Sequence, residues 1–270
     1  MAYKLGWFST ARGGGSRALL KTANDCIRNG DVKAEIDFVF CSRDPGESAE
    51  TDIFLERVKS YGIPLVCFSY QKFKAKFGSR AKVGTIPPWR LEYDREIMQR
   101  LEGFHPDLCV LAGYMLVVGP ELCTRYNMIN LHPAAPEGPK GTWQEVIWHL
   151  INTKARTTGV MMHLVTPELD RGPVVAYCTF SIRCERFDSL WRNVEWYPED
   201  TPESQAARNA LFDTIRKHGL AREFPLITTT IKAFSEGKIK ITPDKNVVDA
   251  RGKTIAGYDL TKEIDARISV

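Results

Sequence analysis

Three polar side chains from two distant stretches of the chain could act together on a carbonyl group. Asn130 and His132 stand two residues apart in NLHPAAPEGP, which ends an apolar segment, and Asp170 lies in the later stretch PELDRGP. An amide and an imidazole can donate hydrogen bonds to an oxygen that gains negative charge. A carboxylate beside the imidazole would favour its protonated form and raise its pKa. We therefore predict a catalytic site that stabilises a developing oxyanion and moves a proton.

A purely structural interpretation of these residues stays open from their types alone. His132 could form a hydrogen bond within its own turn, and Asn130 could simply end a strand. The prolines at positions 133, 136 and 139 restrict the backbone that follows, which would hold the pair rigidly in either case.

A glycine-rich stretch near the start of the chain, STARGGGSR, is a candidate for phosphate binding. Consecutive glycines allow backbone N–H groups to approach a ligand, and the following helix would add partial positive charge. Ser16 offers a hydroxyl and Arg17 a cation, so we expect Gly15, Ser16 and Arg17 to hold the phosphate. The stretch matches neither the dinucleotide-binding fingerprint nor a P-loop, and a flexible strand-to-helix turn is the alternative.

The elements around these residues alternate between apolar strands and helical patterns. Strands are expected at 3–8, 36–41, 64–68 and 108–112, with helices at 16–29, 49–61 and 89–103. This order predicts an α/β fold, a Rossmann-like, doubly wound and mostly parallel sheet with helices on both faces. In such a sheet, ligands bind beyond the carboxyl ends of the strands, where Asn130 and His132 are expected.

The second half of the chain continues the sheet and then becomes less regular. A short strand at 128–130 precedes a capping box at Thr142–Glu145 that opens a helix to about residue 152, and strands follow at 158–165 and 174–182. We interpret 184–203 as an insertion or surface loop, followed by one helix opened by Thr201-Pro202 and a second at 221–236. The tail at 239–270 is expected to form a small hairpin packed on an edge of the domain. The whole chain, 1–270, is predicted to form a single catalytic domain.

Composition limits the classes of protein to which the chain can belong. Its 270 residues are 43% hydrophobic and 26% charged with a formal charge of +4, which fits a soluble protein and gives no reason to expect nucleic acid as a partner. The seven cysteines are scattered without metal-ligand spacing, so we expect reduced thiols, no metal and a cytoplasmic location. The chain opens without a signal-peptide pattern, and its longest apolar run, 108–119, is shorter than the roughly 20 residues of a membrane span.

The motifs, taken in order, resemble a known family. The stretches GGGS, YDRE, VLAGYM, NLHP and ELDRGP together are similar to the folate-dependent formyltransferases, and among these to the phosphoribosylglycinamide formyltransferases of purine synthesis. The resemblance spans nearly the whole chain, and the ordered combination is specific although each motif alone is weak.

The resemblance implies a reaction and a set of site residues. That family transfers the formyl group of 10-formyltetrahydrofolate to the amine of glycinamide ribonucleotide, without a metal. It implies that Asn130, His132 and Asp170 are catalytic and that Gly15, Ser16 and Arg17 bind the substrate phosphate. The residues that it implies for folate binding are Arg90, Met115, Leu116, Val117, Val118, Asn130, Thr166, Pro167, Glu168, Leu169 and Asp170.

Several departures from the family pattern fall on the acceptor side of the expected site. The run 134–143 differs from the family's usual segment, Arg17 stands where an amide is common, and 217–220 has no matching acid. A formyltransferase for another amine (on a sugar nucleotide or, less well supported, on a tRNA), a 10-formyltetrahydrofolate hydrolase and a non-catalytic folate-binding or nucleotide-binding module therefore remain alternatives. The expected partners are small-molecule substrates, with no membrane, and a homodimer is left open.

Overall fold

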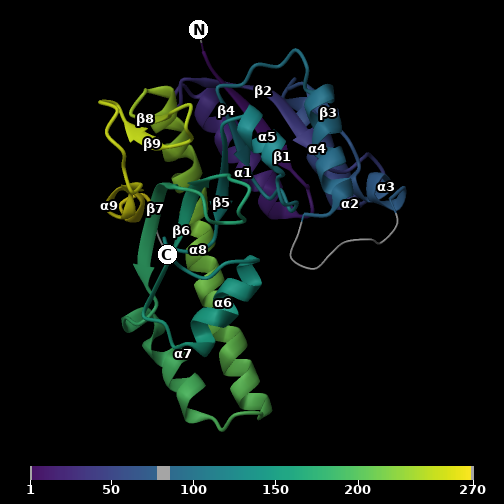
Figure 1. The fold of residues 1–270 in the computed structure, drawn as a ribbon. Coiled ribbons are helices and arrows are strands. Elements are labelled where there is room, and N and C mark those ends of the chain that lie inside the picture. Colours follow the sequence, from purple (N-terminus) through teal and green to yellow (C-terminus); the bar gives the residue numbers. More distant parts are fainter. Residues whose placement is uncertain (1, 78–85, 269–270) are drawn as a thin grey trace.

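A twisted sheet forms the centre of the molecule. The computed structural model describes residues 2–77 and 86–268. Within these ranges the main sheet has eight strands in the order β10-β7-β6-β5-β4-β1-β2-β3 (Figure 1). The strands are β1 (Tyr3–Ser9), β2 (Ala34–Cys41), β3 (Leu65–Cys67), β4 (Leu108–Leu111), β5 (Met128–His132), β6 (Thr157–Leu164), β7 (Val174–Ser181) and β10 (Tyr258–Asp259).

The direction of the strands changes on one side of the sheet. From β3 to β5 every neighbouring pair is parallel, whereas β6 is antiparallel to both β5 and β7. Strand β10 then pairs with β7 in parallel. Among these strands β6 alone therefore runs against the others, and the predicted doubly wound, mostly parallel α/β fold is confirmed.

Helices cover both faces of the sheet because the strands are apolar on both sides. In β1, Leu5 and Trp7 pack with helices α1, α2 and α8, whereas Phe8 points to the opposite face and packs with α4 and α5. The period of two along a strand produces this division. The helices are α1 (Gly14–Arg28), α2 (Ala49–Ser60), α3 (Tyr70–Ala75), α4 (Pro88–Arg100), α5 (Pro120–Arg125), α6 (Trp143–Asn152), α7 (Glu185–Trp196), α8 (Pro202–Ser235) and α9 (Thr261–Asp265).

The segment that follows β7 is helical, and our prediction of a surface loop there was wrong. Helix α7 packs its Phe187 and Trp191 against α6 and the first half of α8, in a hydrophobic cluster that also includes Phe180 of β7. Helix α8 is one continuous element through Pro225, where two helices were predicted. Figure 1 shows α7 and the start of α8 extending away from the sheet as an arm. Burial of apolar side chains between helices explains both differences, because local propensity is weaker than tertiary packing.

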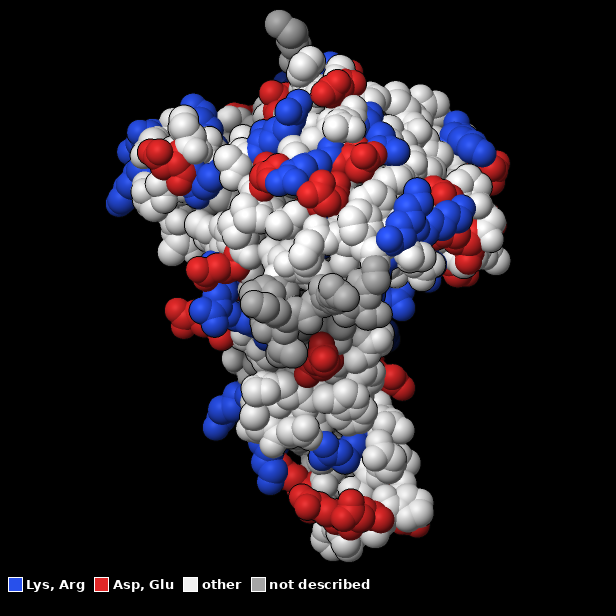
Figure 2. Space-filling model, turned by 45° about the vertical axis from the view of Figure 1, so that its right-hand side comes forward, with Lys and Arg blue, Asp and Glu red and all other residues white. Residues whose placement is uncertain are grey.

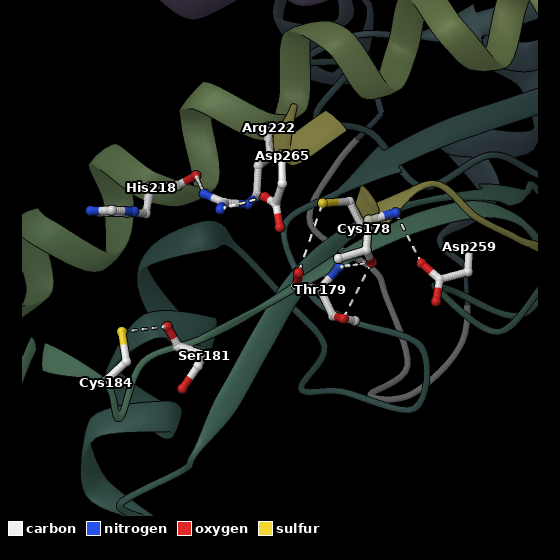
Figure 3. A network of polar contacts seen from close by, with 9 residues as sticks. Cys178, Thr179, Ser181, Cys184, His218, Arg222, Asp259 and Asp265 are labelled. Carbon is white, nitrogen blue, oxygen red and sulfur yellow. Dashed lines mark hydrogen bonds and ion pairs between the residues drawn. The ribbon is translucent and has the colours of Figure 1, made fainter. Parts of the chain in front are cut away.

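The C-terminal segment is attached to strand β7 and to helix α8. Strands β8 (Ile239–Ile241) and β9 (Val247–Asp249) form a separate hairpin, while β10 lengthens the main sheet at its edge. Arg222 of α8 donates from Nη2 to Asp265 at the end of α9, at 2.7 Å, and from Nη1 to the carbonyl oxygen of His218 (Figure 3). The predicted hairpin is confirmed, whereas the single catalytic domain stays a prediction.

Charged side chains of both signs are mixed over the surface. Figure 2 shows Lys and Arg next to Asp and Glu across the upper part of one face, and acidic side chains grouped at the lower end of the arm. None of the helices within the described ranges combines the length and the apolar composition that a membrane span requires.

Removing the carboxylate that holds α9 should destabilise the protein. Asp265→Ala leaves the buried guanidinium of Arg222 without its ion pair, so we expect the free energy of unfolding to fall by about 1–2 kcal/mol in a urea titration. Asp244→Ala, which changes an exposed aspartate in the β8–β9 turn, is the matched control. Equal stability of the two variants would contradict a role for this ion pair.

Candidate active site

The candidate catalytic residues meet at the carboxyl end of β5. Asn130 and His132 lie on the same face of this strand because they are two residues apart, and the His132 side chain is almost fully buried. Strand β6 lies beside them in antiparallel register, with His163 opposite Asn130 and Met161 opposite His132. The loop that follows β6 starts beside the amino end of β5, and it folds back so that Asp170 reaches His132.

Asp170 is held in an uncommon backbone conformation. Its φ is +51°, in the left-handed region that aspartate tolerates better than most residues. The loop closes tightly on β6 at Gly172, where an added Cβ would lie 1.7 Å from the carbonyl oxygen of Leu164. This close approach requires glycine. The carboxylate is thereby directed inward, with Oδ2 of Asp170 at 3.8 Å from Nδ1 of His132.

A second imidazole, that of His163, completes the cluster. Its Nε2 lies 3.4 Å from Oδ1 of Asp170 and 3.2 Å from Nδ2 of Asn130, and its Nδ1 lies 3.0 Å from the carbonyl oxygen of Leu164. From the sequence we had interpreted His163 as a supporting residue within a strand, without assigning it a contact. A buried histidine in an otherwise apolar strand was the available signal, but its partners depend on the register of β5 and β6.

The proline-rich loop after β5 covers the cluster. The carbonyl oxygen of Pro139 lies 3.0 Å from Nε2 of His132, and since a carbonyl only accepts, this nitrogen carries a hydrogen. The backbone N–H of Gly141 donates to Asp170. The predicted capping box is confirmed, because Thr142 and Glu145 exchange hydrogen bonds at the start of α6. The loop that departs from the family pattern therefore contacts two of the three predicted catalytic side chains.

Burial dominates the protonation of His132, which reverses our expectation. The pKa of His132 is lowered from its ordinary value because desolvation outweighs the bond to Pro139 and the charge of Asp170, both of which raise it. The pKa of Asp170 is also lowered: burial acts to raise it, but His163, His132 and the Gly141 N–H together favour the carboxylate. The resting site thus contains an ionised Asp170 beside a His132 that is neutral at pH 7.

The predicted phosphate loop lies at the end of β1, two strands away from β5. Gly15, Ser16 and Arg17 belong to the first turn of α1, which begins at Gly14. The Ser16 hydroxyl packs against Gly113, since an added Cβ there would lie 2.5 Å from its Oγ. The Arg17 guanidinium forms an ion pair with Glu50 of α2. The three residues are therefore brought together, although Arg17 already has an anionic partner.

Two of the segments predicted to bind folate place large apolar side chains on the surface. After β4, Met115 is 48% exposed and Val117 is 36% exposed, whereas Leu116 is partly buried and Val118 is buried. In the loop after β6, Leu169 is 56% exposed. Exposed apolar side chains of this size are typical of ligand sites. Thr166 is half-buried in this loop, and Pro167 and Glu168 are exposed.

Arg90 lies in a different setting from the other predicted folate residues. Its side chain is 3% exposed on α4 and forms an ion pair with Asp94, while Nη2 donates to the Tyr114 hydroxyl at 3.3 Å. Asp94 in turn accepts from the backbone N–H of Gly119 at 2.6 Å. Arg90 thus supports the segment that contains Met115 and Val117 from beneath, and its predicted contact with folate stays a prediction.

The described residues provide no metal site near this cluster. Across residues 2–77 and 86–268, no three His, Cys, Asp or Glu side chains are grouped so that they could hold a metal ion.

Comparison with known proteins identifies the family. The model of the formyl transferase family matches residues 13–187, which include the glycine loop, both histidines and Asp170. The chain belongs to the formyl transferase family. Its sheet, with the reversed strand β6 beside β5, is therefore the scaffold of a formyltransferase enzyme.

Comparison with individual relatives shows formyltransferases that the chain resembles along most of its length, but it does not define the substrate. The chain is 26% identical to a phosphoribosylglycinamide formyltransferase of Haemophilus influenzae, over 88% of this chain and 92% of the relative. A solved phosphoribosylglycinamide formyltransferase of Coxiella burnetii shares the fold, with a TM-score of 0.68, 21% identity and coverage of 96% and 99% of the two chains. A formyltetrahydrofolate deformylase of Haemophilus influenzae is 30% identical, but over only 32% of this chain and 31% of the relative.

Replacing His163 should change the protonation of Asp170. His163→Phe keeps a ring of similar size but removes both nitrogens, so the interaction that lowers the pKa of Asp170 is lost and this pKa should rise. The measurement is a carbon-13 NMR titration of the Asp170 carboxyl, with His149→Phe on the exposed side of α6 as the control. An Asp170 titration that is the same in both variants would show that His163 does not act on the carboxylate.

Proposed function

We propose that this protein transfers the formyl group of 10-formyltetrahydrofolate to the amine of a small phosphorylated acceptor. The convergence of Asn130 and His132 of β5 with Asp170 of the loop after β6 is the observation that carries the proposal. The first acceptor to test is 5-phosphoribosylglycinamide, because the relatives that cover nearly the whole chain carry that name.

The proposed chemistry assigns a separate task to each side chain. Attack of an amine on a formyl carbon places negative charge on the formyl oxygen and leaves a proton to remove. The Asn130 amide donates a hydrogen bond to that oxygen. Neutral His132 takes the proton from the amine, and the ionised Asp170 stabilises the imidazolium that results. Collapse of the tetrahedral intermediate then breaks the bond between the formyl carbon and N10 of the folate, and this nitrogen takes a proton as tetrahydrofolate leaves. The lowered pKa values of both groups suit these tasks, because each begins in the required form.

The proposed binding sites are the start of α1 for the acceptor phosphate and a group of exposed apolar side chains for the folate. The first turn of α1, where the phosphate would bind, contains no acidic residue of its own, and no side chain caps the helix. The folate would lie against Met115, Val117 and Leu169, whose exposed apolar surface it would cover. In this proposal the chain 1–270 acts as one catalytic domain.

Hydrolysis of the same formyl donor is the second candidate function, because the chain is also similar to a deformylase. Water would then replace the amine at the same three side chains. An absorbance assay with 10-formyltetrahydrofolate, run with and without 5-phosphoribosylglycinamide, separates the two functions. Folate release that needs the amine supports transfer, and an equal rate without it supports hydrolysis. Binding of the folate with no turnover under either condition would refute both.

His132→Ala should lower kcat for formyl transfer by about 10²–10³, since it removes the proton acceptor beside the reacting carbon. His149→Ala serves as the control, because that histidine is exposed on α6 and remote in sequence from the cluster. A His132 variant within twofold of the wild-type rate would remove this residue from the mechanism.

The pH dependence of kcat/KM should follow the neutral form of His132. Activity is expected to fall as pH drops through its lowered pKa, because the protonated ring cannot accept the proton from the amine. The charge of Asp170 raises the pKa of His132, so Asp170→Asn should move this acidic limb to lower pH while also reducing the maximal rate. The acceptor amine titrates identically in the assays of the variant and of the wild type, so a difference between their pH profiles arises from the enzyme. An acidic limb that moves to higher pH would contradict the assignment.

A further inference from the structure

The cation of the proposed phosphate site is not free in the folded chain. Arg17 forms its ion pair with Glu50 through Nη1 and Oε2, and this pair joins the first turns of α1 and α2. The two residues lie 33 positions apart in the chain. From the sequence, Arg17 was an expected phosphate ligand and Glu50 had no assigned role.

The guanidinium lies directly at the start of α1. An added Cβ on Gly14 would be 3.6 Å from Nη2 of Arg17, which places the charged group against the first residue of the helix. The Glu50 carboxylate bonded to this group therefore sits beside the backbone N–H groups that the proposed phosphate would use. The carboxylate of Glu50 thus lies next to the position proposed for the substrate phosphate.

The two helices differ in how their N-terminal ends are satisfied. Helix α2 is capped by the Ser48 side chain and contains Glu50 and Asp52 in its first turn. Helix α1 begins after Gly13 with neither a side-chain cap nor an acidic residue. Because Glu50 belongs to a helix that other groups already cap, it can leave Arg17 without exposing that helix end.

The ion pair is weak enough to exchange. The Arg17 side chain is 23% exposed and that of Glu50 is 45% exposed, and ion pairs at such sites contribute little to stability because water and salt screen them. A phosphate that replaces the carboxylate gains the guanidinium and the end of α1, but it also meets the negative charge of Glu50 close by.

We infer that Glu50 competes with the acceptor phosphate for Arg17 and sets the affinity of the acceptor site. The inference rests on the proposed function, because it requires the phosphate to bind at the start of α1. Small anions that offer nothing except charge gain little by displacing Glu50, whereas an acceptor with further contacts can do so. Glu50 would thereby reduce occupation of the site by free inorganic phosphate.

Binding of inorganic phosphate, measured by phosphorus-31 NMR at pH 8 and low salt, tests this inference without any formyl transfer. Glu50→Gln should bind inorganic phosphate about three- to tenfold more tightly than the wild type. The matched control is Glu56→Gln on the same helix, whose carboxylate is exposed and pairs with Lys59, and it should bind as the wild type does. The double variant Arg17→Gln, Glu50→Gln should lose the gain, and added sodium chloride should reduce it.

The outcomes distinguish this inference from the proposed function. Unchanged phosphate binding by Glu50→Gln would overturn the competition. Weaker binding would also overturn it and would show instead that Glu50 orients Arg17. Absence of phosphate binding in every variant would overturn the phosphate site and the competition together, whereas the absorbance assay decides formyl transfer independently. Glu50→Ala provides the same comparison if Glu50→Gln does not fold, as judged by circular dichroism.

Discussion

The buried carboxylate of Asp170, set between two imidazole rings, is the interaction on which the rest of the candidate site depends. Burial acts to raise the pKa of this group, whereas His163, His132 and the backbone N–H of Gly141 act to lower it. These three partners come from β6, β5 and the loop before α6. The position of one carboxylate is therefore determined by three separate parts of the chain.

The direction of β6 determines how Asp170 reaches the cluster. In a fully parallel sheet the loops after β5 and β6 would emerge at the same edge. Here β6 runs antiparallel, starts beyond His132 and ends beside Met128, at the amino end of β5. The loop after β6 therefore folds back over the sheet, with a close approach to β6 at Gly172, before Asp170 reaches His132. The antiparallel register also places His163 opposite Asn130, beside the same carboxylate.

The carboxyl ends of three neighbouring strands place the proposed binding segments close together. The glycine loop follows β1, the segment with Met115 and Val117 follows β4, and His132 ends β5, and these strands are adjacent in the sheet. The backbone N–H of Thr10 donates to the carbonyl oxygen of Gly113 at 3.0 Å, so the first two of these segments contact each other. The arm of α7 and α8 lies outside this group and packs its apolar side chains against α6, which begins directly after the loop over His132.

The sequence by itself determined the fold class, most strands and helices, the capping box of α6 and the motifs of the family. These features depend on local patterns: the apolar periodicity of strands and helices, and side chains that bond within four residues. Only the tertiary structure decided that His163 joins Asp170, that Pro139 and Gly141 contact the cluster, that Arg17 pairs with Glu50, and that 184–203 is mostly helix. These features depend on how separate parts of the chain pack together. The tertiary structure also decided that burial lowers the pKa of His132, although the charge of Asp170 acts to raise it. Spacing along a sequence contains no measure of such contacts or of desolvation.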